Sequence, residues 1–382
     1  MTASAEPPAS AEQAVRVAVV DDSTFIRKAI LRMLDDEPMI SVVGSAGSGE
    51  ELLTHLDDWR PDVITLDLDM PGMGGLATLD RIMGRRPTPV IILSTHSGKG
   101  APLTIEALHR GATDFIDKQQ YSLVDFAALR AVLIERIFQV TDRVPVSEAE
   151  PAPPTAKSPP LSPVEPQTGA SEAGEATTYA YDLIVIGAST GGPPTLQKIL
   201  EDLGDSIPVP VVVVQHMPVG FTHAFAERLN AYLPLQVSEA HSMEHLLADS
   251  VYIAPAGAHL RISRQGSDLI SETSTFPKGM PHMPSIDVLF DSAARTVGRR
   301  VIGALLTGMG RDGAQGMAAV KYRGGYTLCQ DEKTCVVFGM PRAALALGAV
   351  REVASPDVMG RRIQQLLVNG PSEAPFLRRP SS

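Results

Sequence analysis

The stretch LIVIGASTGGPP, residues 183–194, runs from an aliphatic segment into a small, glycine-flanked turn with Ser189 in its middle. Residues 187–191 fit the pattern G-x-S-x-G, in which small residues permit a sharp turn from strand to helix and lift the serine hydroxyl above the edge of a sheet. The two prolines that follow suit the first turn of a helix, where a missing N–H costs nothing. The stretch therefore predicts a strand, a turn and a helix, with Ser189 as a candidate nucleophile.

A glycine-rich loop that binds a phosphate or a dinucleotide is the competing interpretation of this stretch. A phosphate-binding loop requires Gly-Lys-Ser/Thr, which is absent here. A dinucleotide site requires an acidic residue at the end of the next strand. That strand, VPVVVVQHMP at residues 209–218, ends on His216 instead. These details argue against a phosphate loop and against a nicotinamide dehydrogenase.

A serine nucleophile near neutral pH needs a general base, and an imidazole at the adjacent strand end usually acts as that base. Of the nine histidines, His216 alone directly follows a buried-looking strand. The imidazole in turn needs an acid that fixes its tautomer and stabilises its charged form. Asp312 is the best candidate, because LLTGMGRDGAQG, residues 305–316, is a glycine-rich loop that leaves a strand and enters a helix. The alternative is that Asp312 only caps that helix, expected over 313–323.

Polar side chains also follow the expected strands of the N-terminal half, at Asp21, Asp22, Asp67, Ser94 and Lys118. In a doubly wound parallel sheet the carboxyl ends of neighbouring strands converge on one crevice. Three carboxylates gathered there repel one another unless a divalent cation holds them, and Mg²⁺ suits such oxygen ligands. A carboxylate beside that cation can accept a phosphoryl group, with the lysine and the serine placed to contact its oxygens. Any one of these residues alone is better explained as solvated charge, but the whole set predicts a phosphorylation site.

The pattern of apolar residues predicts two α/β domains. Aliphatic runs alternate with helix-period segments in both halves, which predicts two doubly wound parallel sheets with helices on both faces. The expected strands are RVAVVDD, ISVVGSA, DVITLDLDMP, PVIILST and TDFIDK, then DLIVIG, VPVVVVQH, VIGALLTGMG and GYTLCQ. Helical periods cover 123–140, 194–203, 222–232, 285–297 and 313–323. Residues 250–272 alternate apolar and polar residues around a Gln-Gly-Ser turn, which predicts an antiparallel hairpin.

Three segments fall outside these domains. Residues 144–178 hold eight prolines and no aromatic residue. Such a composition cannot bury enough apolar area to offset the entropy of ordering. We therefore expect a flexible linker over 143–180, a disordered N-terminus over 1–14 and a C-terminal tail over 371–382.

The composition excludes several classes of protein. A net charge of -11 opposes a broad nucleic-acid surface or an anionic membrane as the main partner. The chain after residue 180 begins with a strand and lacks a basic recognition helix, which argues against a DNA-binding regulator. Cys329 and Cys335 are too few for a disulfide framework or a zinc site, and we expect them to be reduced. With no signal peptide and no apolar run long enough to cross a bilayer, a cytoplasmic protein is expected.

Residues 15–142 resemble the receiver domain of two-component response regulators, on the motifs VVDDS, DLDMPGMGG, ILST and DFIDK. The resemblance implies a flavodoxin-like fold in which Asp67 is phosphorylated with the help of Mg²⁺. It implies metal ligands at Asp21, Asp22 and Asp67 and switch positions at Ser94, Phe115 and Lys118.

Two residues depart from the receiver pattern. Receivers usually carry aspartate where Gly74 stands, and proline where Gln119 follows Lys118. The second departure removes an expected cis-proline turn. We therefore expect the kinetics of phosphorylation and switching, rather than the fold, to differ from those of other receivers.

Residues 181–370 resemble the C-terminal domain of the chemotaxis response-regulator protein-glutamate methylesterases, on IGASTGGP, VQHMPVGFT, FAERLN, VYIAPAGAHL, PSIDVLFDSAA, LLTGMGRDGAQG and FGMPRAA. The resemblance implies a Rossmann-like domain with a catalytic triad of Ser189, His216 and Asp312. It implies two neighbouring site residues, Thr190 and, through its backbone N–H at the oxyanion, Met309. It implies no cofactor for hydrolysis.

That family hydrolyses the γ-methyl ester of glutamyl residues on the cytoplasmic helices of methyl-accepting chemoreceptors, which releases methanol, and many members deamidate receptor glutamines. The resemblance implies a phosphorylation-activated serine hydrolase for chemotaxis adaptation, with a chemotaxis histidine kinase as phosphodonor. It also implies that the unphosphorylated receiver lies over the active site. The alternative is a C-terminal domain that only binds a partner, against which the intact set of serine, histidine and aspartate argues. We expect neither nucleic-acid binding nor membrane insertion.

One departure in the C-terminal half bears on the choice of substrate. Where the family often has Asn-Arg-His-Arg-Pro-Ser, this chain has MPHMPS at residues 280–285. Pro281 and Met283 thus replace two arginines. If those arginines dock an acidic receptor helix, this protein has weaker electrostatic steering or a different receptor.

Overall fold

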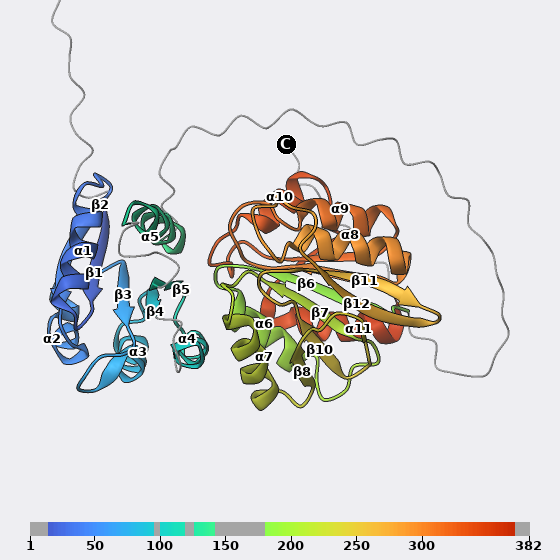
Figure 1. Cartoon of the computed structure of the whole chain (residues 1–382), viewed down its shortest axis with the longest axis horizontal. Helices are drawn as coiled ribbons and strands as arrows, with labels where there is room; N and C mark the ends of the chain where they lie inside the picture. Colours follow the sequence, from blue (N-terminus) through green and yellow to red (C-terminus); the bar gives the residue numbers. More distant parts are fainter. Residues whose placement is uncertain (1–13, 95–99, 119–125, 142–179, 371–382) are drawn as a thin grey trace, which may run out of the picture.

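The computed structural model describes residues 14–94, 100–118, 126–141 and 180–370. They form two α/β bodies, the first coloured blue to teal and the second green to red in Figure 1. The predicted disordered N-terminus, linker and C-terminal tail lie outside the described residues, apart from Ala14 and Ala180, and so does Gln119. No helix within the described ranges has the length and apolar character needed to cross a lipid bilayer.

The N-terminal half is a five-stranded parallel sheet in the order β2-β1-β3-β4-β5. Its elements are β1 (Val15–Val20), α1 (Thr24–Asp35), β2 (Ile40–Ala46), α2 (Gly49–Trp59), β3 (Val63–Asp67), α3 (Gly74–Arg85), β4 (Val90–Ser94), α4 (Gly100–His109), β5 (Asp114–Asp117) and α5 (Phe126–Val140). Successive strand residues point to opposite faces of a sheet. Val17 and Val19 accordingly pack in one core with α1 and α5, whereas Ala18 and Val20 pack in a second core with α2, α3 and α4.

The C-terminal half contains a seven-stranded parallel sheet in the order β15-β14-β13-β6-β7-β10-β8. Its strands are β6 (Leu183–Ala188), β7 (Val211–Gln215), β8 (Gln236–Glu239), β10 (Ser250–Ile253), β13 (Val301–Leu305), β14 (Tyr326–Gln330) and β15 (Glu352–Ala354). A separate three-stranded antiparallel sheet contains β9 (Glu244–His245), β11 (His259–Gln265) and β12 (Asp268–Ser274).

Helices cover both faces of the seven-stranded sheet. One face carries α6 (Gly192–Asp202), α7 (Phe221–Tyr232) and α11 (Pro356–Asn369), and the other carries α8 (Ile286–Val297), α9 (Ala314–Tyr322) and α10 (Met340–Ala346), as Figure 1 shows. A short 3₁₀ helix, Gly298–Arg300, follows α8. Each face buries its own apolar cluster. The prediction of two doubly wound parallel sheets is confirmed.

The predicted strands are all present, but one segment is wrongly assigned. Residues 250–253 were expected in the first arm of the hairpin, and they form β10, which pairs in parallel with β7 and β8. All four of these residues are buried, as in a strand that has neighbours on both sides in a parallel sheet. The hairpin consists of β11 and β12, and β9 adds a third strand to it.

The two halves meet along α4, β5 and α5 of the first and α6 and α7 of the second. The ring of Phe115 in β5 lies against that of Phe221 at the start of α7, with centroids 4.7 Å apart. Glu106 of α4 pairs with Arg228 of α7 at 2.5 Å. One buried apolar cluster continues across this contact. Because both aromatic rings are almost fully buried, the contact removes apolar surface from water and stabilises the docked arrangement.

Candidate active site and phosphorylation site

The predicted phosphorylation-site residues lie together at the carboxyl edge of the N-terminal sheet. Asp21 follows β1 and Asp67 ends β3, the neighbouring strands between which the strand order reverses. Ligands of doubly wound sheets bind at this point. Carboxylate oxygens of Asp21, Asp22 and Asp67 lie within 4.8 Å of one another. Lys118 places its Nζ 2.9 Å from Asp67 Oδ2 and 3.4 Å from Asp21 Oδ2.

The charge of this cluster suits a divalent cation. Burial raises the pKa of Asp21, Lys118 opposes that shift, and Asp67 adds to it. The ammonium group of Lys118 thus pairs with two of three clustered carboxylates, whose oxygens are the ligands that Mg²⁺ prefers. Asp22 is exposed, so ions reach the cluster from solvent. The residues present fit the metal that the receiver resemblance implies.

The expected switch residues connect this cluster to other elements. Ser94 Oγ accepts a hydrogen bond from Thr104 Oγ1 of α4, at 2.5 Å, and both side chains are buried. Phe115 contacts the C-terminal half through Phe221, as described above. Gly74, one of the two departures, adopts a φ of 74°, in the left-handed region that favours glycine. The receiver edge is therefore connected through α4 and β5 to the second body.

Ser189 lies in the turn between β6 and α6, as its sequence pattern predicts. Gly191 adopts a φ of 74°, and a Cβ atom there would overlap Val336. A Cβ atom on Gly187 would overlap Ile286 of α8. The turn thus requires glycine at both positions, and it leaves Ser189 7% exposed at the strand end.

His216 and Asp312 lie at the ends of the two strands that flank β6. His216 follows β7, Asp312 lies in the loop after β13, and the sheet order is β13-β6-β7. His216 Nε2 is 2.9 Å from Asp312 Oδ2. The other ring nitrogen, Nδ1, is buried and has no hydrogen-bond partner among the described residues. Because Ser189 and His216 line one cavity of about 240 Å³, Nδ1 is the atom available to the serine hydroxyl, and such bonds often close only when substrate binds.

Asp312 does not cap the helix that follows it, so that alternative is wrong. The N-cap of α9 is Gly313, and Asp312 instead accepts hydrogen bonds at the N-terminus of α8. Burial alone raises its pKa, but the hydrogen bond and charge of His216 and two backbone N–H groups outweigh burial and lower the pKa to about 2. Its partners besides His216 are Ser285 Oγ at 2.8 Å, Ile286 N at 2.8 Å and Asp287 N at 3.0 Å.

Thr190 and Met309, the two other predicted site residues, contact the N-terminal half. Thr190 Oγ1 donates to Asp114 Oδ2 at 2.9 Å and accepts a hydrogen bond from Arg136 of α5. Gln139 of α5 reaches the sulfur of Met309. Arg136 also pairs with Asp114 at 3.0 Å and lines the cavity that holds Ser189 and His216. No motif marked Arg136 in the sequence, and its position closes one side of the cavity.

His282 is a further site residue that the sequence did not single out. Its ring stacks on that of His216, with centroids 4.1 Å apart and planes at 21°. Desolvation of the ring against its neighbours, followed by repulsion from His216 whenever that ring is protonated, lowers the pKa of His282 to about 4, so it is neutral near pH 7. The available signal was its place within MPHMPS. Met283 of the same stretch lines the cavity, whereas Pro281 is exposed, and neither supplies charge.

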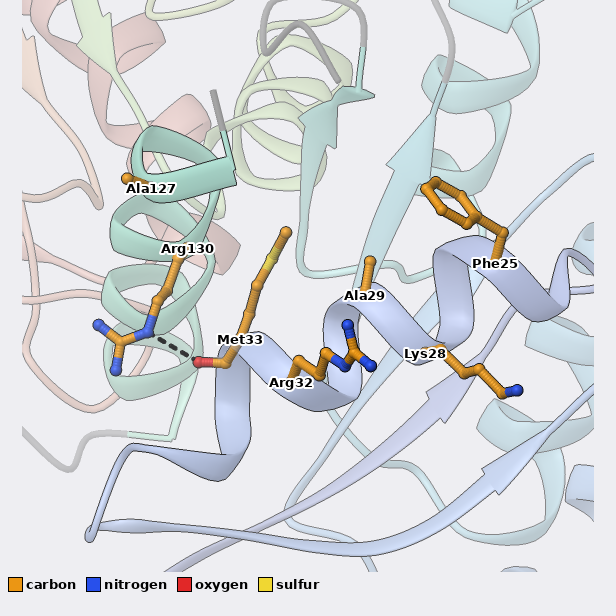
Figure 2. A pocket seen from close by; sticks show the side chains of 7 residues that line it. All are labelled: Phe25, Lys28, Ala29, Arg32, Met33, Ala127 and Arg130. Atoms are coloured by element: carbon orange, nitrogen blue, oxygen red, sulfur yellow. Dashed lines mark hydrogen bonds between the residues drawn. The ribbon is translucent and has the colours of Figure 1, made fainter. Parts of the chain in front are cut away.

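A separate groove of about 510 Å³ lies between α1 and α5 (Figure 2). Its apolar part includes Phe25, which is 63% exposed. Among the described residues that line it are three cations and no carboxylate: Lys28, Arg32 and Arg130. Arg130 Nε donates to the backbone oxygen of Met33 at 2.9 Å, drawn as a dashed line in Figure 2. The groove is thus an apolar surface with a positive rim.

The two bodies together define a response regulator that carries a candidate phosphorylation edge and a serine-hydrolase-like site in one chain. Comparison with family models agrees with this division. Residues 17–128 match the response regulator receiver domain, and residues 184–363 match the family described as CheB methylesterase. The chain belongs to the family of the protein-glutamate methylesterase/protein-glutamine glutaminases.

Relatives share most of the chain. The protein-glutamate methylesterase/protein-glutamine glutaminase of Methylobacillus flagellatus is 38% identical over 93% of this chain and 98% of its own length. That of Oleidesulfovibrio alaskensis is 40% identical over 91% of this chain and 98% of its own length. Among solved structures, the Thermotoga maritima CheB methylesterase catalytic domain is 38% identical, covers 49% of this chain and 98% of that chain, and has a TM-score of 0.48.

Proposed function

We propose that this protein is a phosphorylation-activated protein-glutamate methylesterase and protein-glutamine glutaminase that acts on methyl-accepting chemoreceptors. The observation that carries the proposal is the placement of Ser189, His216 and Asp312 at three adjacent strand ends, with His216 Nε2 on Asp312 and Nδ1 without a partner among the described residues. Acyl transfer to water requires a nucleophile, a base and an orienting acid in this relation. Methanol release from methylated receptor membranes by the full-length protein, with a small phosphodonor, tests it.

The proposed reaction begins when His216 Nδ1 takes the proton of Ser189 as Oγ attacks the γ-carbonyl carbon of the ester. Backbone N–H groups of the glycine-rich loop, that of Met309 among them, receive the oxyanion. The imidazolium returns its proton to the departing methoxide, and methanol leaves. Water then attacks the acyl-enzyme with the same base and frees the glutamate. A glutamine amide follows the same steps with ammonia as the leaving group.

Asp312 supports these steps through its charge. With a pKa of about 2, it remains a carboxylate across the neutral range and stabilises the imidazolium that forms on His216. Its hydrogen bond at Nε2 also holds the ring and leaves Nδ1 as the nitrogen available to Ser189. The neutral ring of His282 stacks on the ring of His216 and limits its rotation.

Regulation follows from the receiver side chain that lines the catalytic cavity. Arg136 of α5 lines it beside Ser189, so a receptor helix has no access to the nucleophile while the bodies are docked. A phosphoryl group on Asp67 attracts the hydroxyl of Ser94, which in this structure is bonded to Thr104 of α4. Release of that bond alters α4, which carries the Glu106–Arg228 pair to α7. Phosphorylation thereby weakens docking and exposes the site.

Replacement of Asp67 tests the phosphorylation site. Bound Mg²⁺, held by Asp21, Asp22 and Asp67, supplies charge neutralisation at the phosphoryl oxygens. We expect Asp67→Asn to form no acyl phosphate with acetyl phosphate and to remain at the basal rate of methanol release. Chelation of Mg²⁺ should do the same to the unchanged protein. Asp69→Asn, at a neighbouring exposed position, should respond normally; acyl phosphate on the Asp67→Asn protein would contradict the assignment.

We propose that the histidine-containing phosphodonor docks in the groove of Figure 2. The donor must bring its phosphohistidine to Asp67, so it has to lie over the carboxyl edge of the receiver. The α4–β5–α5 side is covered by the C-terminal half, whereas α1 begins directly beside the acid cluster and presents Phe25 to solvent. The cations of the groove match an acidic donor surface with an apolar contact residue.

Charge reversal at this groove separates docking from chemistry. We expect the double variant Lys28→Glu and Arg32→Glu to slow phosphotransfer from the kinase by about tenfold or more at low salt. Its phosphorylation by acetyl phosphate, which needs no docking, should be unchanged. Arg81→Glu, an exposed cation on α3, is the matched control. Equal slowing with both phosphodonors would place the effect in the phosphorylation site instead.

A further inference from the structure

The N-termini of α8 and α9 are linked by two carboxylates, Asp312 and Asp287, each of which accepts hydrogen bonds from the other helix. Asp312 lies two residues before α9, yet it accepts the backbone N–H groups of Ile286 and Asp287 in the first turn of α8. Asp287 belongs to α8, yet its Oδ1 accepts the backbone N–H of Gly316 in α9 at 2.7 Å. The N-terminus of α8 is therefore capped by Asp312 from the loop before α9, and the N-terminus of α9 is capped by Asp287 from α8.

The first turn of α9 depends on Asp287. The N-terminal N–H groups of a helix have no partner within the helix and are satisfied by a side chain or water. The N-cap of α9 is Gly313, which has no side chain to offer. Gly316 also lies so close that a Cβ atom there would overlap Phe290 and approach the backbone of Asp287. Asp287 thus anchors α9 at the point where the loop from β13 enters it.

That loop carries the groups that the proposed reaction needs. Residues 306–313 connect β13 to α9 and include Met309 and Asp312. The strand holds one end of the loop through its pairing with β6. The hydrogen bond between Asp287 and Gly316 holds the other end, three residues beyond Gly313. A shift of the helix terminus therefore moves Asp312 relative to His216.

Asp287 is also close enough to Asp312 to act through its charge. Burial raises the pKa of Asp287 to about 6, N–H groups of α9 oppose that shift, and the charge of Asp312 adds to it. Asp312, on the loop before α9, is the titratable group that faces it, with its own pKa near 2. His259 of β11 approaches the N-terminus of α8, where it accepts a hydrogen bond from the backbone N–H of Ser285 at 3.1 Å. Asp291 lies one turn after Asp287 along α8.

We propose that Asp287 is a positioning residue for the hydrolysis reaction. Asp287 holds the first turn of α9 so that Asp312 meets His216, and its negative charge stabilises the imidazolium. The proposal rests on the proposed function of the Ser189 site. It assigns Asp287 no contact with substrate.

The two roles are separable by substitution. Asn at position 287 keeps an oxygen acceptor for the Gly316 N–H and removes the charge, whereas alanine removes both. Removal of a negative charge beside the catalytic pair disfavours the uptake of a proton there. The acid limb of the rate profile therefore moves to lower pH in the Asp287→Asn protein. Asp287→Ala lowers kcat by about ten- to a hundredfold with KM nearly unchanged, because misplacement of the catalytic groups acts on the chemical step.

The experiment measures methanol release from methylated receptor membranes between pH 5 and 9 by the full-length protein, activated with acetyl phosphate. The variants are Asp287→Asn, Asp287→Ala and the matched control Asp291→Asn, whose profile should superimpose on that of the unchanged protein. An unaltered acid limb in Asp287→Asn, or full kcat in Asp287→Ala, overturns the proposal. The position of the acid limb does not depend on the fraction of protein folded, so it distinguishes positioning from mere loss of stability.

A second readout does not depend on activity. The proton of the His216–Asp312 hydrogen bond gives a low-field NMR resonance, whose chemical shift should change in Asp287→Asn and in Asp287→Ala and stay unchanged in Asp291→Asn. An unchanged resonance in both Asp287 variants overturns the proposal even if hydrolysis is observed. Absence of methanol release in the unchanged protein, with these changes of the resonance present, refutes the proposed function and leaves the positioning role intact.

Discussion

Replacement of Ser189 by alanine is expected to abolish methanol release from methylated receptor membranes. In the proposed reaction this hydroxyl forms the acyl-enzyme, and the neighbouring hydroxyl of Thr190 is bonded to Asp114 and Arg136 instead. Loss of the nucleophile in serine hydrolases costs about 10⁴-fold or more in kcat. The measurement is methanol release by the phosphorylated full-length protein. Ser206→Ala, at an exposed position, is the matched control.

Companion variants define the roles of the other two residues. His216→Gln should reduce the rate as far as Ser189→Ala, because base and nucleophile act as a unit. Asp312→Asn should also lose activity and should in addition be less stable, because Asp312 accepts hydrogen bonds from the end of α8. A Ser189→Ala protein that releases methanol would refute the hydrolase assignment. Normal phosphorylation without hydrolysis by the unchanged protein would instead support a domain that only binds a partner.

Replacement of Arg136 by alanine is expected to raise the activity of the unphosphorylated protein. Arg136 comes from the receiver body, bonds to Thr190 and Asp114, and lines the catalytic cavity. Hydrogen bonds to a charged group contribute about 1.5–3 kcal/mol, so their loss should shift the docking equilibrium about ten- to a hundredfold toward the open form. The basal rate should rise by a similar factor, up to the rate of a fragment that begins at residue 180.

The measurement is methanol release without phosphodonor, compared with the rate after addition of acetyl phosphate. The phosphorylated rate should change little, because the open form then predominates in both proteins. Arg130→Ala is the matched control, since Arg130 lies on the same helix but contacts the backbone of Met33 in the groove beside α1. A basal rate that equals that of the unchanged protein, in both Arg136→Ala and the fragment, would refute inhibition by docking.

Local pattern was sufficient to predict both parallel sheets and the two edges where side chains meet. Parallel strands of a doubly wound sheet bring their carboxyl ends to one edge, so residues that end neighbouring strands lie together whatever their separation along the chain. Asp21 and Asp67, and likewise Ser189 and His216, could be placed on this ground alone. The turn at Ser189 could also be predicted from a few neighbouring residues, because the close approach at Gly187 and the positive φ at Gly191 both require glycine.

Short or half-polar elements were not predictable in this way. The sequence pattern assigned the residues of β10 to the hairpin and did not predict β8, β15, α10 or α11. β8 is QVSE and β15 is EVA, and neither has enough residues to show a period. Such strands are stabilised by hydrogen bonds to a neighbouring strand rather than by their own pattern.

The sequence by itself determined the fold class, the strand-end positions of the reacting groups and the acid cluster of the receiver, because each depends on patterns within a few residues. Only the tertiary structure decided that Asp312 binds His216 through Nε2 and caps α8, that Arg136 closes the cavity, and that Asp287 anchors α9. These contacts join residues far apart along the chain, 96 positions in the case of His216 and Asp312. Their geometry is set by how helices pack on the sheets and how the two bodies dock, which no local pattern records.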